Sequence, residues 1–215
     1  QVMAMGTNTD PYQPVEKSLR ITRSILEVLA AFNHPVGIVT KSALVMRDID
    51  ILGPMAEKGL AQVCVSVTTL DRRLANRLEP RAATPTLRIE TIRALADAGI
   101  PCGVMAAPMI PALNDAELEA ILETARDAGA TLASYILLRL PLEIAVLFEE
   151  WLQTHVPNRA KHVMNLVYGA RGGKAYDPTY GTRMRGTGEY AAMLKKRFEI
   201  AASRLGLNPQ DRNRL

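Results

Sequence analysis

The chain has 215 residues, of which 48% are hydrophobic and 22% charged. This composition is ordinary for a globular protein, and the apolar runs are of strand length, too short for membrane spans. No charged segment followed by an apolar leader opens the chain, so a cytoplasmic protein is the default expectation.

The formal net charge of +4 is unevenly distributed. Residues 151–215 carry a net charge of +8 and residues 1–150 one of −4. A basic region can bind a polyanion, although a solvated basic helix is the commoner explanation. If the chain contacts nucleic acid, we expect the contacts in the region from Arg159 to Arg214, with the candidates Arg183, Arg185, Lys195, Lys196 and Arg197.

Short apolar runs alternate with amphipathic stretches from the start of the chain. The runs are typical of strands buried in a parallel sheet and fall at residues 2–5, 36–40, 63–67, 103–106 and 132–138. Apolar residues at helical spacing predict helices at residues 18–32, 48–58, 84–98, 114–128 and 144–152, and a last helix at 190–205.

Capping signals mark several helix ends. The first helix is predicted to begin at Ser18 and to bury a stripe formed by Ile21, Ile25, Val28, Leu29 and Phe32. Asn114 and Glu117 have the spacing of a capping box. Glycine, which adopts left-handed backbone without strain, ends three helices, at Gly59, Gly99 and Gly129.

Five consecutive strand-helix units predict right-handed crossovers and either a barrel or an open parallel sheet. A closed eight-unit barrel usually needs about 250 residues. We therefore predict an α/β fold: a partial (βα) barrel with an open parallel sheet of about five strands at residues 1–156. A basic loop and helix form a C-terminal extension at residues 157–215. Gln1 in place of Met suggests a chain that begins inside a domain, and an exposed sheet edge near it would favour dimerisation.

Polar residues gather at the predicted carboxyl ends of the strands, where ligands bind in parallel α/β folds. They include Asn8, Thr9, Asp10, Lys41, Ser66, Thr68 and Arg139. Asp10 has an alternative role in a turn, Asn114 as a cap, and the segment at residues 68–71 as the entry to a helix. Lys41 is harder to explain structurally, because a cation at the end of an apolar strand needs a ligand or a neighbouring acid as a partner.

Self-sufficient catalytic motifs are missing from the sequence. It contains no Walker phosphate loop, dinucleotide fingerprint, paired-histidine zinc motif or nucleophile elbow. The two cysteines, Cys64 and Cys102, lie far apart in strand-like runs, as expected of small buried hydrophobic residues. The residues themselves therefore predict no metal site.

Several blocks together resemble the radical S-adenosylmethionine (SAM) superfamily, and in particular its spore photoproduct lyase-like branch, often labelled DNA repair photolyase-like. In chain order the blocks are GTNTDPYQP at residues 6–14, IVTKS at 38–42, VSVTTLD at 65–71, LEPR at 78–81, APMIP at 107–111, LND at 113–115 and RMRGTG at 183–188. No block is specific alone, and the resemblance rests on their order and spacing over nearly the whole chain.

The resemblance implies a partial (βα)6 barrel that uses S-adenosylmethionine and a [4Fe-4S] cluster to generate a 5′-deoxyadenosyl radical. It also implies a lyase-like reaction on an unknown substrate, which DNA could be. The family holds its cluster with a C-x-x-x-C-x-x-C loop after the first strand, and that motif is missing here. The five strands then resemble the second to sixth of the family. The cluster cysteines are expected upstream of Gln1, and this chain alone is expected to bind no cofactor and to be inactive.

The resemblance also suggests roles for individual residues. Asn8, Thr9 and Asp10 resemble the segment that contacts the cofactor amino group, Lys41 the lysine that meets its carboxylate, and Ser66, with Thr68 in the same block, the segment near the ribose or carboxylate. The remaining cofactor-binding candidates are Glu79 and Arg81 on the ribose side, and Pro108, Ile110 and Arg139 beside the adenine or the substrate.

Two alternatives come from other classes of protein. A barrel-end lysine such as Lys41 could form a Schiff base, as in class I aldolases. The chain could also be a non-catalytic nucleic-acid-binding module that works through its basic region.

Overall fold

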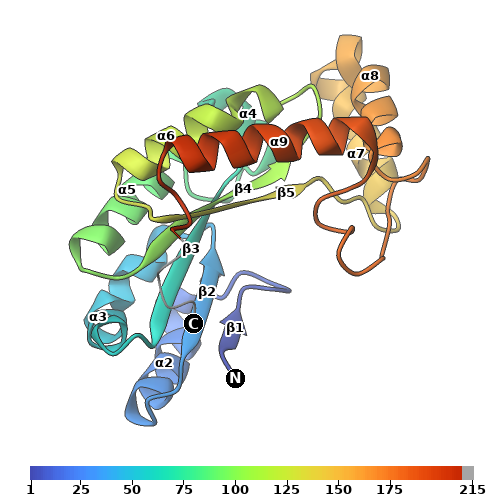
Figure 1. The fold of residues 1–215 in the computed structure, drawn as a ribbon. Helices are drawn as coiled ribbons and strands as arrows, with labels where there is room; N and C mark the ends of the chain where they lie inside the picture. Colours follow the sequence, from blue (N-terminus) through green and yellow to red (C-terminus); the bar gives the residue numbers. More distant parts are fainter. Residues whose placement is uncertain (210–215) are drawn as a thin grey trace.

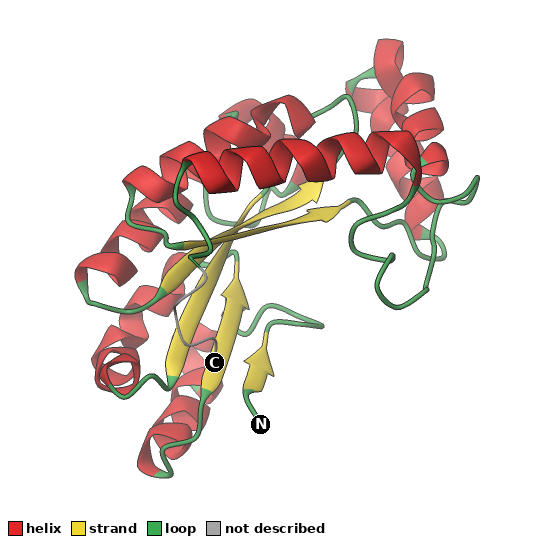
Figure 2. Cartoon of the chain, viewed as in Figure 1, coloured by secondary structure: helices red, strands yellow, loops and turns green. Residues whose placement is uncertain are grey.

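The computed structural model describes residues 1–209 and shows one five-stranded parallel sheet with the strand order β1-β2-β3-β4-β5 (Figures 1 and 2). The strands are β1 (Met3–Met5), β2 (Val36–Thr40), β3 (Ala61–Val67), β4 (Cys102–Met109) and β5 (Leu132–Leu137). β1 and β5 lie at the two edges of the sheet. The prediction of an open partial barrel is therefore confirmed.

Helices follow each strand. They are α1 (Glu16–Leu19), α2 (Ile21–Ala31), α3 (Ile49–Glu57), α4 (Arg72–Leu78), α5 (Pro85–Asp97), α6 (Leu118–Asp127), α7 (Ile144–His155), α8 (Pro157–Gly169) and α9 (Gly188–Arg204). The helices between β1 and β5 form the crossover connections, and α7, α8 and α9 follow the last strand. Two short 3-10 helices, η1 (Ala43–Asp48) and η2 (Asp115–Glu117), precede α3 and α6. Figure 2 shows helices along one side of the curved sheet. Because every neighbouring pair of strands is parallel, all the carboxyl ends lie at the same edge.

Two groups of buried side chains hold these layers together. The larger group lies between the sheet and α2, α3, α5, α6 and α9, and includes Leu26, Val63, Ile92 and Ile121. The smaller group joins the segment after β5 to α7 and α8. Figure 1 shows these two helices beside the end of β5, so the second group fixes the chain that leaves the sheet at its carboxyl edge.

The first predicted helix differs from the structure in its start and in its buried face. Arg20 has a left-handed φ of 53° and separates α1 from α2, and Ser18 donates to the Val15 carbonyl instead of capping a helix. Residues Ile21, Ile25, Val28 and Phe32 are exposed, whereas the buried side chains are Thr22, Leu26 and Leu29. Leu29 is buried as predicted, but the rest of the stripe was wrong, because the buried face is rotated around the helix toward Thr22 and Leu26.

The C-terminal part also contains a helix that the sequence analysis missed. α8 begins at Pro157, a favoured first residue of a helix, and its Val163 and Met164 pack in the smaller core group. α9 packs on α6 and β5. Residues 210–215 of the predicted extension, including Arg214, lie outside the described residues.

Candidate functional site

A cavity of about 400 Å³ lies at the carboxyl ends of the strands. Its walls come from the segments that end or follow β1, β2, β3, β4 and β5: Gly6, Asn8, Thr9, Asp10, Val39, Thr40, Lys41, Ser66, Met105, Ala107, Pro108, Ile136, Leu137, Leu138 and Arg139. A groove of about 730 Å³ between α7 and α8 is larger. We consider the smaller cavity the candidate site, because polar side chains from the ends of β1, β2, β3 and β5 converge there.

Asp10 ties the loop after β1 to the end of β2. Its carboxylate accepts hydrogen bonds from the Tyr12 amide at 2.9 Å, the Thr40 hydroxyl at 2.7 Å and the Lys41 amide at 2.7 Å. Gly6 makes the sharp exit from β1 with a φ of +92°, and a Cβ at that position would lie 1.9 Å from the Val39 carbonyl oxygen. Asp10 thus forms the predicted turn and also lines the cavity.

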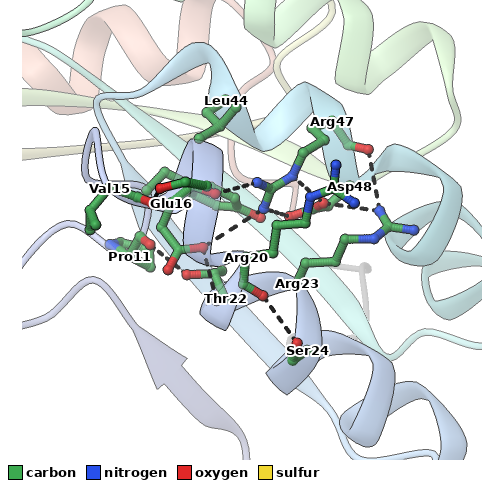
Figure 3. Close-up of polar contacts among 12 residues, drawn as sticks. Pro11, Val15, Glu16, Arg20, Thr22, Arg23, Ser24, Leu44, Arg47 and Asp48 are labelled. Atoms are coloured by element: carbon green, nitrogen blue, oxygen red, sulfur yellow. Dashed lines mark hydrogen bonds and ion pairs between the residues drawn. The ribbon is translucent and has the colours of Figure 1, made fainter.

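A network of charged residues joins the segment after this loop to η1 and α2 (Figure 3). The Arg47 guanidinium donates to the Glu16 carbonyl at 2.7 Å and to the fully buried Asp48 carboxylate at 2.8 Å. Arg23 of α2 donates to Asp48 at 3.1 Å, and the Glu16 carboxylate accepts from the Thr22 amide at 3.0 Å. These contacts fix the segment between β1 and α2 against η1.

Lys41 has an acidic partner inside the protein. Its ammonium contacts one oxygen of Glu79, and the other oxygen accepts from Arg88 at 2.7 Å and from the Thr68 hydroxyl at 3.0 Å. Burial, the nearby Arg88 guanidinium and the opposing effect of Asp10 together lower the pKa of Lys41 to about 8. Burial also lowers the pKa of Arg88 to about 10, against the effect of Asp10.

Asn114 connects the ends of β3 and β4. Its side chain is fully buried, accepts from the Ile110 amide at 2.6 Å, and donates to the carbonyls of Thr68 at 2.6 Å and Pro108 at 3.0 Å. The predicted capping box is wrong, because Asn114 makes no capping hydrogen bond and Glu117 instead accepts from the distant Thr69 hydroxyl and Leu70 amide.

The segment 171–187 packs against the end of β5 and against Arg139. Arg171 is 3% exposed and donates to the carbonyls of Leu137 and Leu138 at 2.9 and 2.8 Å and of Arg183 at 2.7 Å. Arg139, which lines the cavity, donates to the Tyr176 hydroxyl at 3.1 Å and lies 5.4 Å from the centre of that ring. The segment therefore places an arginine-aromatic pair beside the site.

The cavity collects most of the cofactor-binding candidates but not all of them. Asn8, Thr9, Asp10, Lys41, Ser66, Pro108 and Arg139 line it. Arg81 lines an adjoining cavity of about 380 Å³ that shares Asp10 and Lys41. Thr68 and Glu79 contact each other outside the lining, and Ile110 is buried in the smaller core group. Sequence reasoning missed the apolar wall at residues 136–138. The position of these residues at the end of a predicted strand was the signal that could have indicated it.

The nucleic-acid candidates lie in different environments. Arg185 lies 4.0 Å from the centre of the Tyr135 ring, and Arg197 pairs with Glu119 at 2.6 Å. Both are engaged inside the protein. Lys195 lies 3.7 Å from Glu199, Lys196 is exposed, and Arg183 lies over the exposed ring of Tyr180, 5.6 Å from its centre. Nucleic-acid contact by these residues stays a prediction.

The cysteines do not fit an iron-sulfur cluster. Cys64 and Cys102 lie on neighbouring strands, and burial raises the pKa of Cys64 to about 12 and that of Cys102 to about 11, with a further contribution of Cys102 at Cys64. Cluster ligands are thiolates, and three are needed. Within residues 1–209, no three His, Cys, Asp or Glu side chains are grouped to hold a metal ion.

Comparison with known proteins identifies the family. The sequence profile of the Radical SAM superfamily matches residues 1–125, and the chain belongs to this superfamily. It is 31% identical over 212 residues to an uncharacterized protein of Mycobacterium tuberculosis, covering 98% of this chain and 61% of the relative. An uncharacterized protein of Methanocaldococcus jannaschii is 30% identical over 113 residues, covering 53% of this chain and 42% of that protein.

Solved structures give the same fold. Spore photoproduct lyase complexed with dinucleoside spore photoproduct matches with a TM-score of 0.64 at 16% identity, over 96% of this chain and 59% of that chain. A mutant with bound AdoMet and dinucleoside spore photoproduct matches with a TM-score of 0.58 at the same identity and coverage. The chain thus spans about 60% of the length of these proteins and of the mycobacterial relative. Among residues 1–209, no helix is long and apolar enough to cross a membrane.

Proposed function

We propose that the chain forms the S-adenosylmethionine-binding part of a radical SAM enzyme of the spore photoproduct lyase-like branch. The observation that carries the proposal is one strand-end cavity that contains Lys41, Asp10, Asn8 and Thr9 in a chain of this superfamily. In the proposal, three thiolates that hold a [4Fe-4S] cluster come from a segment upstream of Gln1. The cofactor would supply hydrogen-abstraction chemistry through a 5′-deoxyadenosyl radical.

The side chains in the cavity suit the two charged ends of the cofactor. An amino acid carboxylate needs a cation, for which Lys41 is placed, and an ammonium needs acceptors. Asp10 already accepts three hydrogen bonds from its own fold, so Asn8 and Thr9 are better placed to offer additional acceptors. Ser66, which we propose for the ribose side, lines the same cavity, as do Pro108 after β4 and Arg139 after β5.

Substitution of Lys41 tests the proposal. In the full-length protein at matched cluster content, Lys41→Met should weaken S-adenosylmethionine binding at least about tenfold, a change of roughly 1.4 kcal/mol. Lys161→Met, on α8, is the control and should bind normally. Isothermal titration calorimetry measures both. Equal affinity in Lys41→Met and the unaltered protein would overturn the assignment, and borohydride trapping of a carbonyl compound on Lys41 would favour the Schiff-base alternative.

A nucleic acid is the substrate class that we propose. Support comes from two arginine-aromatic pairs whose rings both lie in the segment 171–187, Arg139 with Tyr176 and Arg183 with Tyr180, and from the 89% exposed Tyr180 ring. Exposed aromatic rings stack on bases at about 1–3 kcal/mol per base, and arginines pair with phosphates.

Single-stranded DNA binding by the full-length protein tests this substrate class. Tyr180→Ala should weaken binding about tenfold, as expected from roughly 1.4 kcal/mol of lost stacking, whereas Tyr180→Phe should retain it. Arg183→Gln should lower the salt dependence by about one phosphate contact. No DNA binding, or a salt dependence that changes only with charge reversal at Lys195 and Lys196 on α9, would contradict a role for this segment.

A further inference from the structure

A chain of contacts runs from the interior of α5 to the candidate cavity. Arg88 is 2% exposed and donates to the Ala83 carbonyl and the Ser66 carbonyl, both at 2.9 Å, and to Glu79 at 2.7 Å. Glu79 accepts in addition from Thr68 and contacts the Lys41 ammonium. The exposed fraction of the side chain rises along this chain from 3% for Arg88 to 15% for Glu79 and 34% for Lys41.

Glu79 stands between two cations. Its carboxylate bridges them, with one oxygen toward Arg88 and the other toward Lys41, which leaves little freedom for the side chain. Arg88 is held by three partners, so it acts as the fixed end of the chain of contacts. The other charged groups that line the two cavities containing Lys41 are Asp10 and Arg139 in the candidate cavity, and Lys17 and Arg81 in the adjoining one.

Resting on the proposed function, we infer that Glu79 is a positioning residue that keeps Lys41 protonated and directs its ammonium toward a carboxylate ligand, with Arg88 and Thr68 fixing Glu79. Without the Glu79 charge, two partly desolvated cations would face each other, and Lys41 would be the one to lose its proton because a guanidinium holds its proton more firmly than an ammonium. Ligand binding would then become pH-dependent in the neutral range.

The size of the effect follows from the present state of Lys41. Burial and Arg88 already lower its pKa to about 8. If Glu79→Gln lowers this pKa by about one further unit, the protonated fraction at pH 8 falls from about one half to about one tenth, and carboxylate affinity falls about fivefold. At pH 6 Lys41 is protonated in both proteins, so the difference nearly disappears.

The first experiment measures Lys41 without cofactor. Rates of acetylation by acetic anhydride, followed peptide by peptide with mass spectrometry from pH 6 to 10, give the pKa of Lys41 in the unaltered protein, in Glu79→Gln and in the control Glu150→Gln on α7. Only Glu79→Gln should lower the midpoint, by at least about one unit. Glu79→Asp, whose shorter carboxylate still faces Arg88, should give a smaller shift and provides a second measurement if Glu79→Gln fails to fold.

The second experiment adds S-adenosylmethionine to the same proteins with matched cluster content at pH 6 and pH 8. Affinity in Glu79→Gln should fall about fivefold at pH 8 and less than about twofold at pH 6. An unchanged Lys41 pKa in both Glu79 variants overturns the inference, whatever the cofactor does. If the pKa of Lys41 is lowered in the Glu79 variants but Lys41→Met leaves cofactor affinity unchanged, Glu79 controls the charge of Lys41 and the proposed function is overturned.

Discussion

Asn114 offers a sharp test of how the cavity is held open. Its amide joins the Thr68 and Pro108 carbonyls and the Ile110 amide, so one side chain fixes the segments that leave β3 and β4. Asn114→Ala would leave three polar backbone groups without this partner in a site that is fully buried. Each unsatisfied buried group costs about 1–3 kcal/mol, and we expect a loss of stability of at least about 3 kcal/mol.

Asn208 provides the matched control for this prediction. It also makes two hydrogen bonds, to the amide and carbonyl of Ala133 at 2.9 and 3.0 Å, but it is half-buried and absent from the cavity lining. Its left-handed φ of 58° suits glycine. Asn208→Gly should therefore cost about 1 kcal/mol and leave ligand binding unchanged.

Urea unfolding followed by circular dichroism measures both stabilities. Ligand affinity is a second measurement, because Asn114 supports the segment that carries Ala107 and Pro108 in the cavity wall. Asn114→Ala should weaken S-adenosylmethionine binding in the fraction that remains folded, whereas Asn208→Gly should not. If the two variants lose equal stability, the three hydrogen bonds do not hold the two strand ends in the way that we infer.

Two further predictions concern the loop after β1 and the α6-α9 contact. Gly6→Ala should lower the free energy of unfolding in urea by more than about 2 kcal/mol, because it combines left-handed backbone strain with a close contact. Gly59→Ala has the same kind of strain but open space around it, and should cost about 1–2 kcal/mol. Equal losses of stability in the two variants would contradict the contact argument. Arg197→Ala should cost about 0.5–1 kcal/mol at pH 7 and Lys196→Ala almost nothing. Arg197 holds the pKa of Glu119 below its usual range. The stability that this ion pair contributes is therefore present above pH about 4.3 and is lost as pH falls through the lowered pKa. A difference in melting temperature between Arg197→Ala and the unaltered protein that persists at pH 2 would refute this explanation.

The order of strands and helices could be predicted because it depends on local sequence patterns. β-branched runs such as residues 36–40 have few alternatives to a buried strand, and Gly59, Gly99 and Gly129 all have positive φ where their helices end. The helix predicted at residues 84–98 is α5, which Thr84 caps with its hydroxyl accepting from the Leu87 amide at 3.4 Å. These signals involve residues within a few positions of one another.

Features that depend on distant partners could not be predicted in the same way. Glu117 has the spacing of a capping residue, yet it accepts hydrogen bonds from Thr69 and Leu70, which are more than 40 positions away. The buried face of α2 is set by the sheet beneath it, and so Leu26 is buried although Ile25 beside it in sequence is exposed. In both cases the local pattern fits two arrangements equally well, and tertiary contacts select the one that the sequence analysis did not predict.

In the candidate site, the environment of Lys41 depends both on a local sequence pattern and on contacts with distant residues. The strand-end position of Lys41 predicted a partner of opposite charge, and Glu79 is such a partner, but no local pattern indicates that Arg88 would hold that same carboxylate. Asp10 is likewise occupied by Tyr12, Thr40 and Lys41. A zwitterionic ligand would therefore have to exchange or share existing partners. Its affinity would depend on the difference between two sets of charged contacts, and substitutions at Glu79 or Arg88 should change recognition without touching the ligand.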